Sequence, residues 1–88
     1  MKVILSPRAE KQLRKITKID QIAIAKKIRD ISVAEKIPGE EKLAGFKNIF
    51  RIRVGDYRIV YHKQSSQFYI ILIRHRRDVY DLLRQILD

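Results

Sequence analysis

The chain of 88 residues contains no cysteine, so neither a disulfide framework nor thiolate chemistry is open to it. Glycine is scarce, and the three glycines, at positions 39, 45 and 55, form no phosphate-cradling loop. No apolar run approaches the ~20 residues of a membrane span. The three apolar residues after Lys2 are too few for the core of a signal peptide. These absences favour a cytoplasmic protein that does not enter a membrane.

Several kinds of catalytic site are also excluded. The two histidines, His62 and His75, fall on different expected elements and have no third ligand at a suitable spacing for a metal. No serine stands in a nucleophile motif, and no pair of carboxylates has a suggestive arrangement. We therefore expect neither a metal nor a cofactor.

Positive charge dominates what is present. Twenty Lys and Arg against ten Asp and Glu give a net charge of +10, and the isoelectric point is near 10.2. This balance indicates a polyanionic partner, namely nucleic acid, an acidic protein or an anionic membrane. The alternative is a basic surface that serves solubility alone. With 45% hydrophobic residues the chain is not disordered, and its length allows one domain, residues 1–88.

The first half of the chain has helical periodicity. A short strand, Val3–Leu5, is expected before a helix that is capped by Ser6, starts at Pro7 and runs to about Lys18. Asp20 is the expected cap of a second helix, which fades near Glu35. The apolar stripe of that helix is formed by Ile24, Ile28 and Ile31. Pro38-Gly39 marks a loop.

After Gly45 the period changes to two, which is typical of strands. The pattern predicts a three-stranded antiparallel meander whose strands are 50–54, Tyr57–Lys63 and Phe68–Ile73. A tight turn at Gly55-Asp56 joins the first two strands, and a polar turn joins the last two. A short C-terminal helix then follows, outlined by Val79, Leu82, Leu83 and Ile86. The expected fold class is α+β, with an N-terminal strand and a helical hairpin packed on the sheet.

The Gly55-Asp56 turn fixes which side chains share a face. With a two-residue turn, Arg53 lies opposite Arg58, and Arg51 lies diagonally close. Like charges paired across strands destabilise a sheet, and a bound anion would relieve them. Arginine forks match phosphate oxygens, which favours an anion-binding face over the alternative of arginines that splay into water.

A second basic cluster follows the last strand, and it can converge with Arg58. It consists of Arg74, His75, Arg76 and Arg77, followed by Tyr80. RNA cleavage needs little beyond such residues, because RNA carries its own nucleophile in the 2′-hydroxyl. Arginines can hold the phosphate and stabilise its charge but are poor bases, so proton transfer falls to Tyr80, His75, His62 or an RNA or ribosomal group. The alternatives are that Tyr80 is a packing residue and that His75 is an ordinary surface histidine.

Two segments, KLAGFKNIFRIRVGDYRIVY at 42–61 and IRHRRDVY at 73–80, carry a family resemblance. With the helical hairpin before them, they make the whole chain resemble the RelE/ParE toxin superfamily, and its RelE branch in particular. The resemblance implies a RelE-like fold and the toxin of a type II toxin–antitoxin system, with an acidic antitoxin as partner. RelE-type members enter the ribosomal A site and cut mRNA, which leaves a 2′,3′-cyclic phosphate.

The resemblance also implies roles for individual residues. The positions that match the family's site are Arg51, Arg53, Arg58, Arg76 and Tyr80, and a C-terminal histidine that acts as general acid in some relatives keeps His75 as a candidate. This sequence differs from the family pattern in two ways. RelE-type members often have lysine at the strand positions of Arg51 and Arg53, and Arg74 stands where glycine is common.

These observations lead to one hypothesis and two rivals. We expect a metal-independent mRNA endoribonuclease in which Arg51, Arg53 and Arg58 grip phosphates, Arg76 stabilises the transition state, and Tyr80 or His75 moves protons. Arg74 and Arg77 extend the expected RNA-binding surface. One rival is a ParE-like inhibitor of DNA gyrase without nuclease chemistry. The other is a basic RNA-binding module without catalysis.

Overall fold

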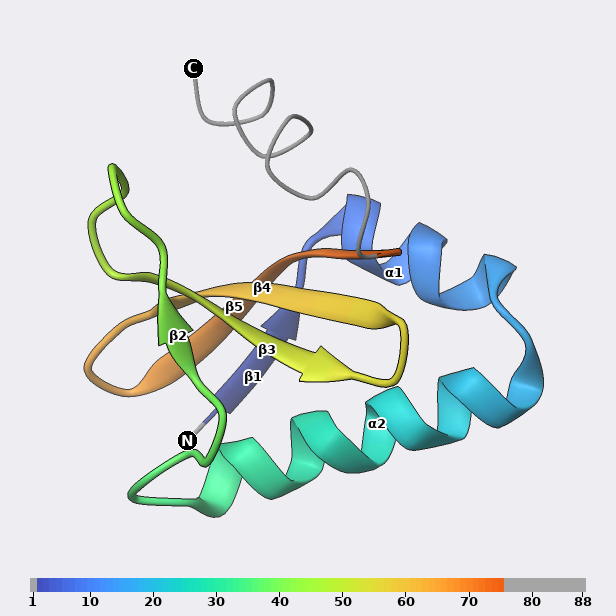
Figure 1. The fold of residues 1–88 in the computed structure, drawn as a ribbon, viewed down its shortest axis with the longest axis horizontal. Coiled ribbons are helices and arrows are strands. Elements are labelled where there is room, and N and C mark those ends of the chain that lie inside the picture. Colours follow the sequence, from blue (N-terminus) through green and yellow to red (C-terminus); the bar gives the residue numbers. More distant parts are fainter. Residues whose placement is uncertain (1, 76–88) are drawn as a thin grey trace.

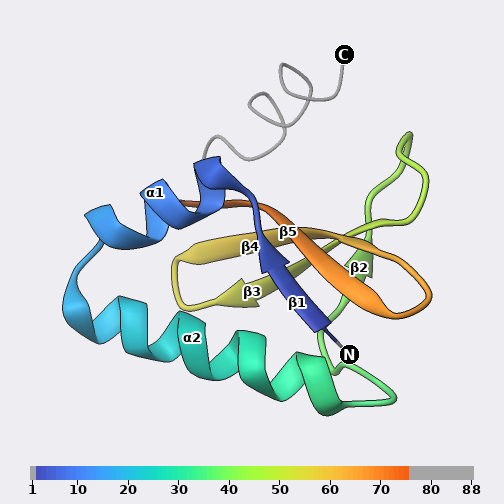
Figure 2. The same cartoon turned by 180° about the vertical axis from the view of Figure 1, so that it is seen from behind.

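The computed structural model describes residues 2–75, in which two helices cover one face of a five-stranded sheet (Figures 1 and 2). The helices are α1 (Pro7–Lys15) and α2 (Lys18–Val33). The strands are β1 (Lys2–Leu5), β2 (Glu41–Lys42), β3 (Ile49–Val54), β4 (Tyr57–Lys63) and β5 (Gln67–His75), and they lie in the order β1-β5-β4-β3-β2. The predicted α+β class and the β3–β4–β5 meander are confirmed.

The sheet as a whole is mixed, because the N-terminal strand joins the antiparallel meander in the parallel direction. β1 pairs in parallel with β5, from Lys2 beside Gln67 to Leu5 beside Ile70. The two helices carry the chain from β1 to β2 on the opposite edge of the sheet. β1 therefore lies beside β5, the last strand of the meander, rather than beside β3, the first. The two-residue strand β2 on the opposite edge was not predicted, because two polar residues carry no periodic signal.

The helix starts follow local capping chemistry. Ser6 caps α1 as predicted, and its hydroxyl accepts a hydrogen bond from the Ala9 amide at 3.0 Å. The prediction of Asp20 as the second cap was wrong. Thr17 caps α2, and its hydroxyl accepts from the Asp20 amide at 3.4 Å and donates to the Asp20 carboxylate at 3.0 Å. The first helix therefore ends at Lys15 rather than near Lys18.

The main core lies between the helices and the sheet. The predicted stripe of Ile24, Ile28 and Ile31 is buried against the sheet. From the sheet, it meets a set of buried side chains on the helix-facing side of β3, β4 and β5: Ile52, Ile59, Tyr61, Phe68, Ile70 and Ile73. Neither described helix is long and apolar enough to cross a membrane. The predicted C-terminal helix, with Val79, Leu82, Leu83 and Ile86, lies outside the described residues.

Candidate nucleic-acid interface

The β3–β4 hairpin has the register that the Gly55-Asp56 turn predicted. Gly55 adopts a positive φ of 59°, while Asp56 does not, as in a type II′ turn. Arg53 pairs with Arg58, and Arg51 pairs with Val60. Because Ile52 and Ile59 of the same hairpin are buried against the helices, the three arginines lie on the opposite face of the sheet. We call this side the arginine face.

A bulge in β5 brings a fourth arginine to this face. Val60 pairs with Leu72 but the next residue, Tyr61, pairs with Ile70, so Ile71 is an extra residue in β5. The extra residue reverses the alternation of side chains beyond it. Arg74 therefore pairs with Arg58 and shares its face, and Arg53, Arg58 and Arg74 form a continuous row across three strands.

Hydrogen bonds orient three of these four arginines, Arg51, Arg53 and Arg58. Arg51 Nη2 donates to Glu41 Oε2 at 2.7 Å, and the Arg51 side chain is 24% exposed. Arg53 Nε donates to the Gly55 carbonyl at 3.0 Å, which holds the side chain against the turn. Arg58 Nη1 donates to the Tyr57 carbonyl at 3.3 Å. The chain thus orients these three side chains, and Arg53 and Arg74 are exposed to solvent.

Glu41 is a residue of this face that the sequence did not identify. It pairs in register with Arg51, so its carboxylate lies among the arginines. The hydrogen bond and charge of Arg51, with the charge of Arg58, hold the pKa of this carboxyl below its ordinary value. The only sequence signal for Glu41 is the polar pair at 41–42 before Leu43. That pair does not show that Glu41 lies opposite Arg51, because the pairing depends on where β2 joins the sheet.

The two histidines lie apart from the arginine row. His75 pairs with Tyr57, and their rings meet edge to face with centroids 5.9 Å apart. Tyr57 packs on the helix-facing core, so the His75 side chain lies on the face opposite to Arg74. His62 does share the arginine face, but its strand neighbours are Ile49 and Tyr69.

An acid–base cluster occupies the helix-facing side beside β2. The Tyr61 hydroxyl donates to Glu40 Oε2, and Lys63 Nζ lies 2.8 Å from Glu40 Oε1. The same ammonium stands over the Phe50 ring, 4.6 Å from its centroid. Burial, and next the hydrogen bond and charge of Glu40, raise the pKa of Tyr61 well above its ordinary value. This cluster fixes the chain just before Glu41.

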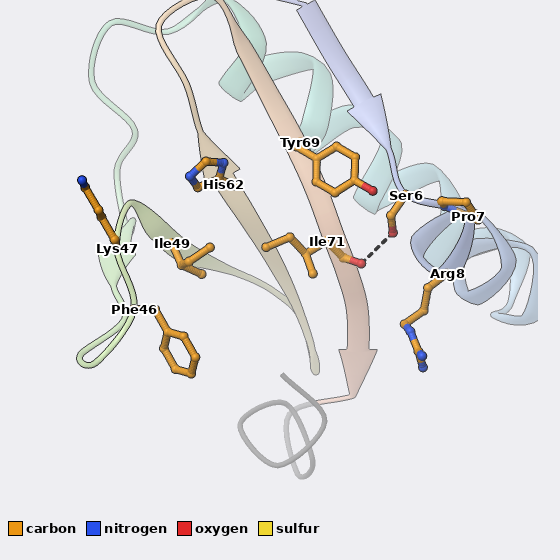
Figure 3. A pocket seen from close by; sticks show the side chains of 9 residues that line it. All are labelled: Ser6, Pro7, Arg8, Phe46, Lys47, Ile49, His62, Tyr69 and Ile71. Carbon is orange, nitrogen blue, oxygen red and sulfur yellow. Dashed lines mark hydrogen bonds between the residues drawn. The ribbon is translucent and has the colours of Figure 1, made fainter. Parts of the chain in front are cut away.

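A groove of about 590 Å³ adjoins the arginine face. Figure 3 shows that it lies over β4 and β5 between the start of α1 and the loop before β3, with His62, Tyr69 and Ile71 toward the sheet. Phe46 and Lys47 come from the loop, and Arg8 comes from α1. Apolar side chains with cations beside them suit a partner that is both apolar and acidic.

Three of the predicted site residues, Arg76, Arg77 and Tyr80, lie outside the described residues. Of the others, Arg51, Arg53, Arg58 and Arg74 come together and His75 does not join them. Within residues 2–75, no group of three or more His, Asp or Glu side chains is placed to hold a metal ion.

Comparisons with known proteins identify the fold and the family of this chain. The family model described as the ParE toxin of a type II toxin–antitoxin system, parDE, matches residues 3–80. Among curated proteins none matches the sequence. The isolated E. coli RelE toxin has a similar structure, with a TM-score of 0.73 and 24% identity over 98% of each chain.

Two archaeal structures are also similar. The RelB–RelE complex of Methanococcus jannaschii gives a TM-score of 0.74 at 22% identity, covering 89% of this chain and 95% of the other. The RelE–RelB complex of Pyrococcus horikoshii gives 0.69 at 25% identity, covering 86% and 94%. The fold is thus that of RelE. Since the family model spans nearly the whole sequence, the chain belongs to the ParE toxin family of the RelE/ParE superfamily and is a toxin of a type II toxin–antitoxin system.

Proposed function

We propose that this toxin is a metal-independent endoribonuclease that cuts mRNA on the ribosome, in the A site, and so inhibits translation in the cytoplasm. The observation that carries the proposal is the row Arg53–Arg58–Arg74 with Arg51 beside it. A continuous line of like charges destabilises a sheet, and a polyanion laid across it offsets that cost. An RNA strand presents phosphates at a spacing that several arginines can grip together.

The proposed chemistry uses the RNA's own 2′-hydroxyl as the nucleophile. Arg51, Arg53 and Arg58 hold the scissile phosphate and its neighbours, while Arg74 and Arg77 extend the grip along the strand. Arg76 stabilises the charge that develops on the phosphoryl oxygens. The products are a 2′,3′-cyclic phosphate and a 5′-hydroxyl, and a DNA strand is inert because it has no 2′-hydroxyl.

Tyr80 and His75 are the proposed proton carriers toward the leaving group. His75 lies on the face opposite to Arg74, beside Tyr57. It would reach the leaving oxygen around the end of β5, where its side chain is exposed. A role for His75 therefore requires that the RNA passes over the end of the strand. If the RNA stays on the arginine face, Tyr80 is the proposed proton carrier.

The proposed partner is a cognate acidic antitoxin. The two archaeal RelE structures above are complexes with RelB antitoxins. In this chain the arginine face and the adjoining groove offer cations beside apolar side chains, which is the surface that an acidic, amphipathic segment covers. Neutralising these arginines would block RNA and suppress toxicity.

The test is cleavage of a defined mRNA in a translating cell-free system. The wild-type protein should produce new 5′-hydroxyl ends at ribosome-positioned sites, and a single 2′-deoxy nucleotide at such a site should abolish cleavage there. Arg58→Ala should abolish cleavage and leave the fold intact. Intact mRNA while the wild-type protein is present in excess over ribosomes would refute the proposal.

Inhibition of DNA gyrase is the second candidate, and the name of the matching family model favours it. It predicts loss of negative supercoiling in a purified gyrase reaction and unbroken mRNA in the translating system. Running both reactions with one protein preparation separates the two functions. A third reading, a basic RNA-binding module without catalysis, predicts salt-sensitive RNA binding with neither effect.

A further inference from the structure

We infer that the groove beside the arginine face holds an unpaired base of the bound RNA, stacked against the rings of Tyr69 and Phe46. The inference rests on the proposed RNA-cleaving function and deepens it, because it adds a contact with a base to the contacts with phosphates. The arginines alone would grip the backbone, which is the same for every nucleotide. The groove offers ring surfaces next to that grip.

The groove and the arginine row lie on one face of the sheet. Three rungs, each drawn from β3, β4 and β5, follow one another on it: Arg53–Arg58–Arg74, Arg51–Val60–Leu72 and Ile49–His62–Tyr69. His62 lies four residues beyond Arg58 on β4, so the first and last rungs are about 13 Å apart. An RNA strand held at the arginine row therefore reaches the groove by following β4.

The walls of the groove are aromatic and its floor is aliphatic. Figure 3 shows the Phe46 ring on one side and the Tyr69 ring on the other, with Ile49 and Ile71 between them. Both isoleucines are buried, whereas Phe46 and Tyr69 are half-buried and so present part of each ring to solvent. The volume of about 590 Å³ is in the usual range of about 300–1,000 Å³ for small-molecule sites, which is enough for a base.

The rim of the groove carries positive charge. Lys47 from the loop and Arg8 from the start of α1 stand at opposite ends of the groove, and both are exposed (Figure 3). Within residues 2–75, neither side chain has a hydrogen bond or an ion pair. A base in the groove would therefore have a cation near the phosphate on each side of it. A purely apolar ligand would gain nothing from these cations, whereas a nucleotide matches both the rings and the charges.

Stacking predicts a preference among the bases. Every base has a flat face, so the groove accepts any of them, and the differences follow stacking strength. The larger ring system of a purine covers more of Tyr69 and Phe46 than a pyrimidine does. We therefore expect the groove to favour adenine over uracil.

Equilibrium binding of two strands that cannot be cleaved tests the inference without ribosomes. One strand is an oligoadenylate with 2′-O-methyl groups, and the other is a chain of equal length and charge that lacks the bases. Each has about eight nucleotides, a common site size for proteins that bind single strands. The wild-type protein should bind the oligoadenylate at least about fivefold more tightly than the abasic chain, which is the lower end of the effect of one stacked base. An oligouridylate should lie between them.

Tyr69→Leu removes the ring and keeps much of the apolar volume. It should weaken binding of the oligoadenylate by about fivefold or more, while its affinity for the abasic chain stays within about twofold of the wild type. Phe46→Leu changes a ring on a separate element and should have the same selective effect. Tyr57→Leu is the matched control, because it makes the same change on the opposite face of the sheet and should retain the wild-type preference.

The inference is overturned if Tyr69→Leu and Phe46→Leu both keep the wild-type preference for the oligoadenylate, or if they weaken both strands equally. It is also overturned if the variants bind both strands as the wild type does but are no longer neutralised by the antitoxin, since the groove would then belong to the antitoxin. A wild-type protein that prefers the oligoadenylate but cuts no mRNA on ribosomes would instead overturn the proposed nuclease function.

Discussion

Arg53 and Arg58 stand directly opposite each other in the β3–β4 hairpin, where two opposite charges would stabilise the sheet. Arg74 continues the row on β5, so Arg58 has a like charge on each side. Like-charged cross-strand pairs cost a sheet stability. The cost is explained if the row serves a polyanion, since function and stability then make opposite demands on the same residues.

A single substitution should separate these demands. Arg53→Thr removes one member of the pair and introduces a residue that favours strands. We expect the free energy of unfolding to rise by about 0.2–1 kcal/mol, the range of cross-strand pair energies. The loss of the exposed bond from Arg53 Nε to the Gly55 carbonyl offsets part of this gain. Urea unfolding measures the stability, and RNA cleavage by the same sample should decrease.

The outcome of that experiment is informative in both directions. If Arg53→Thr destabilises the protein, the pair is not a strain on the sheet, and the argument from repulsion fails. If the variant is more stable and cleaves RNA as fast as the wild type, Arg53 does not belong to the site.

The salt dependence of RNA binding should count the arginines that touch phosphates. For a single-stranded RNA oligonucleotide, each lost contact should reduce the slope of log affinity against log salt by about 0.7. We expect this change for Arg53→Gln, Arg58→Gln and Arg74→Gln. Arg29→Gln, on the exposed surface of α2, is the control, because α2 covers the opposite face of the sheet.

Filter binding between 50 and 300 mM salt, on the order of a sixfold span, gives the slopes directly. A slope that stays at the wild-type value for Arg74→Gln would remove β5 from the RNA path. A slope that falls equally for Arg29→Gln would mean that RNA binds the whole basic surface rather than the arginine face.

The sequence was sufficient for the hairpin because its signals are local. The Gly55-Asp56 turn determined the register, and alternation then assigned Arg51, Arg53 and Arg58 to one face, which the structure confirms. The Ser6 cap and the Ile24, Ile28 and Ile31 stripe were predicted for the same reason. Each of these features depends on residues that are close in the chain.

What the sequence could not provide depends on pairing between distant segments. Arg74 reaches the arginine face only because Ile71 is bulged, and the run Ile70–Ile73 is apolar throughout, so no alternation reveals which residue is extra. Without the bulge, His75 would share the face of Arg58 and Arg74 would not. Glu41 was missed for a similar reason, since β2 is too short to have a period.

The Glu40–Tyr61 hydrogen bond should make stability sensitive to alkaline pH. The pKa of Tyr61 is raised in the folded state, first by burial and then by Glu40. The unfolded chain therefore releases this proton first, at a pH near about 10, and stability falls as pH rises above that value. The contribution is fully present at neutral pH.

Tyr61→Phe provides the comparison, because it keeps the ring in the core and removes the titrating group. The wild-type protein should be the more stable of the two below pH ~10, and its advantage should shrink by up to roughly 1 kcal/mol per pH unit above it. Urea unfolding of both proteins from pH 8 to 11, about the range in which tyrosine titrates, measures the difference. Parallel curves would show that Tyr61 does not titrate differently in the folded state.

Ser6 ties the start of α1 to strand β5, and its loss should be costly for so small a side chain. Its hydroxyl donates to the Ile71 carbonyl at 2.7 Å (Figure 3). The same hydroxyl accepts from the Ala9 amide at 3.0 Å, and the residue is buried. Ser6→Ala removes the cap and leaves the carbonyl of the bulged residue without this donor. We expect a loss of about 1–3 kcal/mol in the free energy of unfolding. Ser6→Thr keeps the hydroxyl and should recover most of it, and equal losses in the two variants would mean that packing at this site, rather than the two hydrogen bonds, determines the effect.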